Sequence, residues 1–175
     1  ALAAGRMTFT FIFSNGDPLT CADVAYTWEA ILSEFSQAST SGYDKIESID
    51  CPDDLTVVVN FSEVYAPYLR LFSYVLPRSA GDPVELDSWE FNRNPIGTGP
   101  WTLTDWQAGN YIEFAPNPTY REEGKPYLDS LIVKILPSRE VGLQLLGTGE
   151  ILSLWDVTEA DFPALDAMAE QGVSY

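Results

Sequence analysis

The sequence predicts a mixed fold of α-helices and β-strands, in the α/β (mixed α+β) class. Segments with alternating apolar residues, which are typical of strands, stand beside segments whose apolar residues recur every three or four positions, which are typical of helices. In the first half, one helix pattern precedes two strand patterns joined by a turn, which predicts a helix packed with an antiparallel hairpin. In the second half, strand and helix patterns alternate, which predicts a βαβαβ part with parallel strands.

The first elements are a strand and a long helix. Thr8–Phe13 alternates with β-branched and aromatic residues, and the turn residues 14–18 follow it. Thr20 is a favourable N-cap, and Asp23, three positions later, can accept from its backbone in a capping box. Apolar residues then recur at helical spacing, so we expect a helix over about Cys21–Phe35.

The middle of the chain predicts a hairpin followed by irregular structure. Lys45–Cys51 and Leu55–Ser62 are two β-rich runs that flank the turn residues 52–54, so they predict an antiparallel hairpin. Ala66–Phe72 has the spacing of a short helix. Residues 78–100 show no clear periodicity, which is more typical of a functional or boundary-crossing segment than of a plain connector.

The second half begins with another hairpin and continues with alternating elements. Trp101–Trp106 and Tyr111–Ala115 predict the hairpin across a turn that contains glycine. The elements expected after it are a strand at Leu131–Leu136, a helix capped by Ser138, a strand at Ile151–Trp155, a helix capped by Thr158 with Asp161, and a strand at Val173–Tyr175.

The charge and the missing histidines exclude several classes of function. Lys and Arg number 9 against 26 Asp and Glu, for a net charge of −17. Nucleic acids and anionic membrane surfaces would repel such a chain, so neither is expected as a partner. The absence of His excludes Ser-His-Asp and Cys-His nucleophiles and imidazole zinc sites from this chain. No apolar run reaches the ~18 residues of a membrane span, so we expect no membrane insertion by this segment.

The two cysteines are candidates for a disulfide, and one group of acidic residues is a candidate metal site. Cys21 and Cys51 could be two buried thiols or a disulfide, because both states fit an even count. Asp50, Asp53 and Asp54 could be interpreted as a calcium cluster, but they lack the spacing of an EF-hand. Acids in a hairpin turn are more often solvated, so we expect no metal and no cofactor.

Trp155 and Asp156 are the candidate ligand-binding residues. They follow the predicted strand Ile151–Trp155 and precede the start of a helix, and ligands of open α/β sheets bind beyond the carboxyl ends of strands. Trp155 could stack on a ligand, and Asp156 could accept from an ammonium or hydroxyl group. The alternative is that Trp155 belongs to the core and that Asp156 is a solvated turn residue.

The string Asn94–Trp101 is the other motif that needs an interpretation. Its glycines resemble an anion-binding loop, but no Gly-Lys-Ser/Thr and no capped helix follow them. The favoured interpretation is a crossing between subdomains, in which Gly97 and Gly99 permit a positive φ and Pro100 stiffens the turn.

Four stretches of the sequence carry a further signal when they are taken together. The most specific of them is Asn94-Pro-Ile-Gly-Thr-Gly-Pro-Trp101. The others are Asn15-Gly-Asp-Pro-Leu-Thr-Cys-Ala-Asp-Val24, Pro52-Asp-Asp-Leu-Thr-Val-Val-Val59 with Tyr65-Ala-Pro67, and Gly149-Glu-Ile151, with Asn117-Pro118 behind the first string. Together they resemble one family, the family 5 extracellular solute-binding proteins of peptide and nickel type ABC importers.

The resemblance implies the lobe of a periplasmic-binding-protein-like receptor. Residues 1–92 would be a helix and hairpin subdomain of the first lobe with its entering strand, residues 93–175 would be the α/β part of that lobe, and the second lobe would lie outside this chain. The implied function is capture of a solute, foremost a peptide, outside the cytoplasmic membrane and its delivery to ABC permease subunits, with no catalysis. Any lipid anchor would lie outside this segment. The oxidising setting that this location implies favours the disulfide between Cys21 and Cys51.

The alternative function is a carbohydrate-active enzyme or carbohydrate-binding fragment that uses carboxylates and Trp. Its basis is the 26 acids and five Trp of the chain, because glycoside hydrolysis needs only Asp or Glu and sugars stack on indole. Against it, no pair of acids stands at matching strand ends with apolar flanks. The sequence therefore favours a binding protein.

Overall fold

The computed structural model describes residues 5–8, 11–34, 36, 38–81 and 89–170. The chain forms two compact units, the first of residues 1–106 with 113–131 and the second of residues 107–112 with 132–175. Three α-helices and two three-stranded sheets lie within the described residues, in agreement with the predicted mixed class. The boundary at residue 93 that the sequence suggests concerns the subdomains of a lobe and stays a prediction.

The first sheet contains the predicted hairpin. Its strand order is β1-β3-β2, with β1 (Gly5–Thr8), β2 (Ile46–Asp53) and β3 (Thr56–Phe61). Both pairings are antiparallel, which confirms the hairpin of β2 and β3. Because side chains alternate between the two faces of a strand, every second residue of β3 is buried on one face, namely Val57, Val59 and Phe61.

The strand predicted at Thr8–Phe13 is wrong in its position, because β1 ends at Thr8. Residues 9–10 lie outside the described part of the chain. Beyond them the backbone turns back on itself, and the Phe13 N–H donates to the Asp17 carbonyl at 2.8 Å. In this local loop, backbone groups that would otherwise pair with a neighbouring strand form hydrogen bonds within the loop. An alternating pattern of apolar residues does not distinguish a strand from such a loop.

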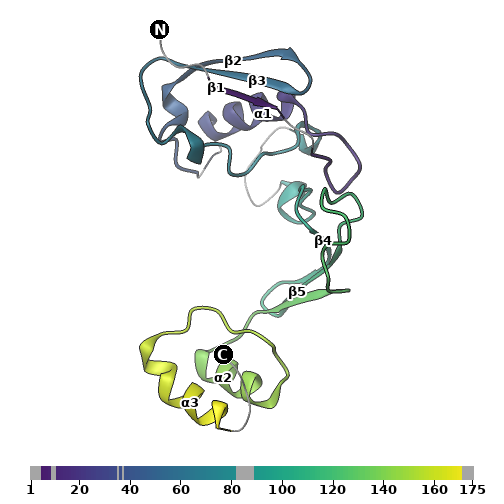
Figure 1. Cartoon of the computed structure of the whole chain (residues 1–175), viewed down its shortest axis with the longest axis vertical. Coiled ribbons are helices and arrows are strands. Elements are labelled where there is room, and N and C mark those ends of the chain that lie inside the picture. Colours follow the sequence, from purple (N-terminus) through teal and green to yellow (C-terminus); the bar gives the residue numbers. More distant parts are fainter. Residues whose placement is uncertain (1–4, 9–10, 35, 37, 82–88, 171–175) are drawn as a thin grey trace. The chain divides into compact units, whose positions relative to one another are not determined.

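Helix α1 (Cys21–Leu32) packs on one face of the first sheet (Figure 1). The predicted capping box is present, because the Asp23 Oδ2 accepts from the Thr20 N–H at 2.7 Å and from the Thr20 hydroxyl at 2.9 Å. The helix ends earlier than predicted, because Ser33 takes an extended conformation. Phe35, the predicted end, lies outside the described residues.

The core of the first unit lies between α1 and the first sheet. Its buried members come from α1, from β2 and β3, and from the segments on either side of them: Phe13, Leu19, Cys21, Val24, Ile46, Val57, Val59, Phe61 and Leu71. Trp28, Tyr65 and Ile96 are among the partly buried side chains that pack against this cluster.

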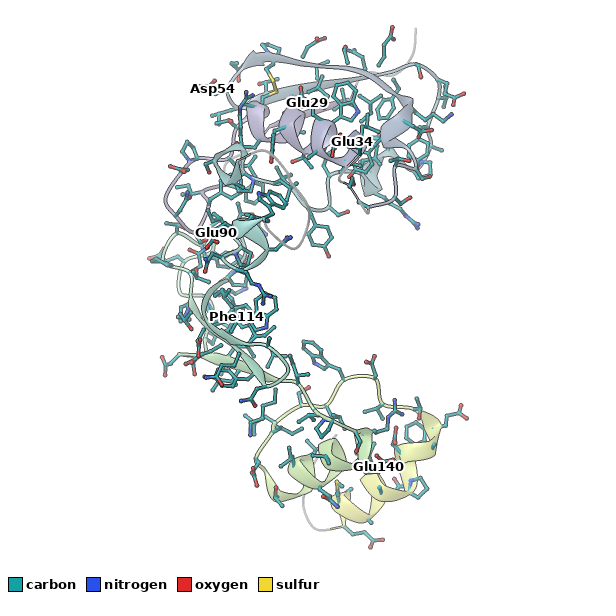
Figure 2. All side chains as sticks on the ribbon, turned by 180° about the vertical axis from the view of Figure 1, so that it is seen from behind. Glu29, Glu34, Asp54, Glu90, Phe114 and Glu140 are labelled. Carbon is teal, nitrogen blue, oxygen red and sulfur yellow. A yellow bond between two sulfur atoms is a disulfide. The ribbon has the colours of Figure 1, made fainter. Side chains whose placement is uncertain are left out.

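A disulfide joins the start of α1 to the hairpin. The Sγ atoms of Cys21 and Cys51 are 2.00 Å apart, and their Cα atoms are 5.7 Å apart. Figure 2 shows this bond beside the labelled Asp54. The Asp54 carbonyl also accepts from the Cys21 N–H at 2.8 Å, so a covalent bond and a hydrogen bond hold the first turn of α1 against the hairpin.

The short helix predicted at Ala66–Phe72 is wrong, because only a single 3₁₀ turn forms at Tyr68–Arg70. Leu71 is extended, and Phe72 has a φ of 56°, which no α-helix accommodates. The Phe72 ring instead contacts the Tyr43 ring edge to face, with centroids 5.3 Å apart. This contact between distant residues favours a bend where the local pattern favours a helix.

The second sheet has the order β4-β5-β6, with β4 (Trp101–Gln107), β5 (Tyr111–Pro116) and β6 (Leu131–Lys134). The predicted second hairpin and the strand after it are therefore confirmed. Two helices follow, α2 (Arg139–Thr148) and α3 (Phe162–Ala169), and both were expected from their caps.

The strand predicted at Ile151–Trp155 is wrong, and with it the βαβαβ arrangement. These residues form no ladder with any described strand, and Leu152 is 94% exposed. Val173–Tyr175, the last predicted strand, lies outside the described residues. A strand needs a hydrogen-bonded neighbour, and an apolar pattern cannot supply one. Residues 151–155 are therefore part of the connection between α2 and α3.

Candidate functional site

The candidate residues Trp155 and Asp156 lie in the loop that joins α2 to α3, and its first half is anchored on α2. Gly149 ends the helix in the left-handed conformation, with a φ of 77°. Leu154 then packs back on the helix, because a Cβ added at Gly142 would stand 2.7 Å from the Leu154 Cδ1. The missing side chain of Gly142 therefore makes the space that Leu154 occupies.

The second half of the loop is fixed by a polar cluster at the start of α3. The Asp161 Oδ2 accepts from the Thr158 N–H at 2.8 Å and from the Thr158 hydroxyl at 3.1 Å, which is the predicted capping box. The Arg139 Nη1, from the first residue of α2, donates to the Asp161 Oδ2 and to the Thr158 Oγ1, both at 2.7 Å. One guanidinium therefore joins the starts of two helices.

These contacts act on the ionisation of Asp161. The carboxylate of Asp161 accepts a hydrogen bond from the Thr158 N–H, and this bond lowers the pKa of Asp161 below its ordinary value. The Thr158 hydroxyl and the Arg139 guanidinium lower this pKa further. Burial opposes them, because Asp161 is only 6% exposed. The carboxylate that fixes the loop is therefore stabilised in its charged form.

Between these two anchors the loop presents its side chains to the solvent. Trp155 is 72% exposed, and Asp156 is exposed beside it. Asp156 has a φ of 61°, in the left-handed region that Asp adopts more readily than most residues. Within the described residues, no packing buries the Trp155 indole, and the Asp156 carboxylate beside it is likewise exposed.

The string Asn94–Trp101 has a structural role in the first unit. The Ser14 N–H donates to the Gly97 carbonyl at 2.8 Å, and the Asn117 Nδ2 donates to the Gly99 carbonyl at 2.7 Å. The string is thus hydrogen-bonded to two segments that are distant in the sequence. The expected positive φ at Gly97 and Gly99 is wrong, because neither residue is in the left-handed region.

Asn117 is a structural residue that the sequence did not single out as such. It is 3% exposed, and its Oδ1 accepts from the Thr119 N–H at 3.0 Å and the Thr119 hydroxyl at 2.7 Å. Its own N–H donates to the Pro100 carbonyl at 2.9 Å. The Asn117 side chain thereby provides hydrogen-bond partners for backbone groups of Gly99 and Thr119.

The acids at the hairpin turn have local partners. The Asp50 Oδ2 accepts from the Asn60 Nδ2 at 2.7 Å, and the Asp53 Oδ1 accepts from the Leu55 N–H at 2.9 Å. Within the described residues, no three His, Cys, Asp or Glu side chains are grouped as metal ligands would be. The bond at Asp53 is the usual Asx contact of a turn residue.

Arg139 is the residue near the candidate loop that the sequence interpretation missed. A signal was available, because Arg139 is the last basic residue of the chain and precedes a capping pattern with an acid at Asp161. A lone Arg opposite a capping Asp favours an ion pair only if the two helix starts meet, and their meeting depends on tertiary structure.

Comparison with known proteins identifies the family. The family model described as bacterial extracellular solute-binding proteins, family 5 Middle, matches residues 12–175. Protein XP55 of Streptomyces lividans is 31% identical over 141 residues, which cover 79% of this chain and 26% of that protein. Oligopeptide-binding protein AppA of Bacillus subtilis (strain 168) is 30% identical over 158 residues, which cover 86% of this chain and 29% of AppA.

Solved structures show the same fold. AppA of Bacillus subtilis in complex with a nonapeptide superposes with a TM-score of 0.75 at 28% identity, over 85% of this chain and 31% of that one. NikZ from Campylobacter jejuni in complex with Ni(L-His) superposes with a TM-score of 0.76 at 24% identity, over 86% of this chain and 32% of that one. The chain thus spans between a quarter and a third of the length of these proteins.

No helix within the described residues is long and apolar enough to cross a membrane. The family match covers nearly all of the chain, and the strings that carried the sequence resemblance fall inside it. AppA, one of these relatives, is named as an oligopeptide-binding protein, which favours binding over the carbohydrate-active alternative. The chain belongs to the bacterial extracellular solute-binding proteins, family 5.

Proposed function

We propose that this protein is the solute-binding component of an ABC-type importer, that it captures a peptide outside the cytoplasmic membrane, and that it delivers the peptide to the permease subunits. The observation that carries the proposal is the similarity to AppA, which is named as an oligopeptide-binding protein and whose solved structure holds a nonapeptide. NikZ, with its nickel complex, supports the fold alone. The proposal includes no catalytic step.

Within this chain, Trp155 and Asp156 are proposed as ligand contacts. Three features support this proposal: the indole is 72% exposed, the carboxylate next to it is exposed, and the loop that holds both is anchored by Leu154 and by Thr158. A loop with fixed ends loses little conformational entropy when a ligand binds. A peptide would stack an apolar side chain on the indole and donate to the carboxylate.

Thermal unfolding of the full-length protein tests the function. The candidate ligands are a nonapeptide, a set of dipeptides, Ni(L-His) and an oligosaccharide. After each measurement, chromatography of the solute shows whether it has remained intact. We expect the peptide to raise the Tm in a saturable way and to be recovered intact, since a ligand at 100 times its Kd stabilises the native state by about 2.7 kcal/mol. Stabilisation by Ni(L-His) but not by peptides would reject the peptide part, and breakdown of a solute would reject the binding role.

Calorimetry with Trp155→Ala tests the site. We expect the affinity for the stabilising peptide to fall by about 5- to 30-fold, because an aromatic contact contributes on the order of 1 to 2 kcal/mol. Trp106→Ala, which removes an indole that is 37% exposed under the Arg93 guanidinium, is the matched control. Unchanged affinity of Trp155→Ala at preserved Tm would reject the site.

Delivery to a permease is tested by reconstitution. The permease and its ATPase subunits in vesicles should hydrolyse ATP faster when the loaded protein is added on the outer side. No stimulation by the loaded protein would contradict the importer role.

A further inference from the structure

The second unit carries an uneven distribution of charge. It has two basic residues, Lys134 and Arg139, against seven acidic ones, and no basic residue follows Arg139. The acidic residues are Glu140, Glu150, Asp156, Glu159, Asp161, Asp166 and Glu170. A surface with an excess of one sign attracts ligands of the opposite sign and repels those of the same sign.

Arg139 is the basic residue that contacts the loop between α2 and α3, and its guanidinium already has partners. The Arg139 Nη1 lies 2.7 Å from both the Asp161 Oδ2 and the Thr158 Oγ1, and Asp161 balances its charge. Asp156 differs, because its carboxylate is exposed and has no hydrogen bond or ion pair within the described residues. The loop therefore presents one negative charge that no neighbouring cation neutralises.

The residue next to Asp156 suits the same kind of ligand. The indole of Trp155 is 72% exposed, and among aromatic rings the indole binds cations best, through its negative face. A carboxylate and an indole on consecutive residues can both contact one ammonium or guanidinium group. An anionic ligand would meet the Asp156 carboxylate in a unit where acidic residues outnumber basic ones seven to two and where Arg139 is already paired with Asp161.

We infer that the loop at Trp155 and Asp156 selects ligands that carry a cationic group, and that among peptides it favours those with basic side chains over acidic ones. This inference rests on the proposed function, because it concerns the same site. It adds the charge class of the ligand, which membership of the family does not specify.

The test uses the full-length protein and three alanine-based nonapeptides that carry Lys, Gln or Glu at alternate positions and are otherwise identical. Calorimetry is run at about 0.01 M salt, where the Debye length is about 30 Å, and at about 1 M salt, where it is about 3 Å. We expect the Lys peptide to bind about 10-fold tighter than the Glu peptide at low salt, and this ratio to shrink at high salt. Equal affinities at low salt would overturn the inference and leave the proposed function intact.

The variant Asp156→Asn tests whether the preference for the Lys peptide over the Glu peptide arises at this loop. Asn adopts the left-handed conformation about as readily as Asp, so this change removes the charge without straining a backbone with a φ of 61°. We expect the Lys-to-Glu ratio to fall by roughly 3- to 10-fold, the range of an exposed charge pair with a cation–π contact. An unchanged ratio would overturn the assignment to Asp156.

Glu170→Gln is the matched control, because it removes one charge from the same unit. Glu170 follows α3, and eight residues of helix place it about 12 Å further along the axis than Phe162. It should leave the ratio nearly unchanged, and a drop as large as that of Asp156→Asn would overturn the local assignment. If no nonapeptide binds the wild-type protein at either salt concentration, the peptide part of the proposed function fails as well.

Discussion

The Asp23 Oδ1 accepts from the Arg78 N–H at 2.8 Å, so one carboxylate at the start of α1 holds a segment that lies 55 residues further along the chain. The Oδ2 of the same group accepts from the Thr20 N–H at 2.7 Å and completes the capping box. Asp23 is only 7% exposed, so its carboxylate depends on these protein donors for its hydrogen bonds.

We expect Asp23→Ala to destabilise the protein by about 2 to 4 kcal/mol, because it removes a helix cap and leaves a partly buried N–H without an acceptor. Chemical denaturation measures this loss. Glu29→Ala is the control, because Glu29 is exposed on the same helix and its loss should change the free energy of unfolding by about 0.5 kcal/mol or less. Equal effects of the two variants would contradict the role of Asp23.

We expect the Cys21–Cys51 disulfide to stabilise the folded state by a measurable amount. It closes a loop of 30 residues, so in the chain-entropy model it stabilises the folded state by about 3 to 4 kcal/mol. We expect the double variant Cys21→Ala, Cys51→Ala to lose an amount of this order in denaturation. Mass spectrometry after alkylation without reduction should find neither thiol modified, and two modified thiols would show that the bond is absent in solution.

Gly42 is expected to tolerate no side chain. Its φ is +88°, and an added Cβ would stand 2.5 Å from the Tyr65 ring, whose own position is set by stacking on Phe61. Gly16, with a φ of +92° and open space around its Cβ position, is the matched control. Gly16→Ala should cost about 1 to 2 kcal/mol for the backbone alone, and Gly42→Ala should cost at least about 1 kcal/mol more for the clash. Equal losses would show that the ring moves freely.

The lowered pKa of Asp161 predicts a pH dependence. Its folded-state value lies below the ordinary Asp value of about 3.9, so the stabilisation is fully present above about pH 4 and is lost as the pH falls through the folded value. The Tm difference between the wild type and Asp161→Asn should therefore be constant near neutral pH and shrink in acid. Glu159→Gln changes an exposed acid of the same turn and serves as the control. A difference that stays constant into acid would reject the linkage.

The net charge of −17 predicts that salt stabilises the protein. Repulsion between like charges opposes the compact state, and added ions screen it. We expect the Tm to rise between about 0.01 M and 1 M NaCl. A fall in Tm would show that the few ion pairs, such as that of Arg139 with Asp161, outweigh the repulsion.

Much of the fold was predictable because its signals are local. The capping boxes at Thr20 and Thr158 involve residues three positions apart, and the β2–β3 hairpin needs only two alternating runs and a turn. The Asn94–Trp101 string pointed to the family without any structure. The positions of Trp155 and Asp156 before a capped helix were also readable from the sequence, although their ligand role stays a proposal.

The mixed class, the family, the caps and the hairpins can be recognised in the sequence, because each depends on neighbours within a few residues or on a continuous string. Three features became visible only in the folded chain: Ile151–Trp155 is a loop, Phe72 bends the chain, and Arg139 joins two helix starts. These features depend on hydrogen bonds and ring contacts between groups far apart in the chain. The free energy of such a contact is set by which partner the fold brings within reach, and no local pattern contains that information.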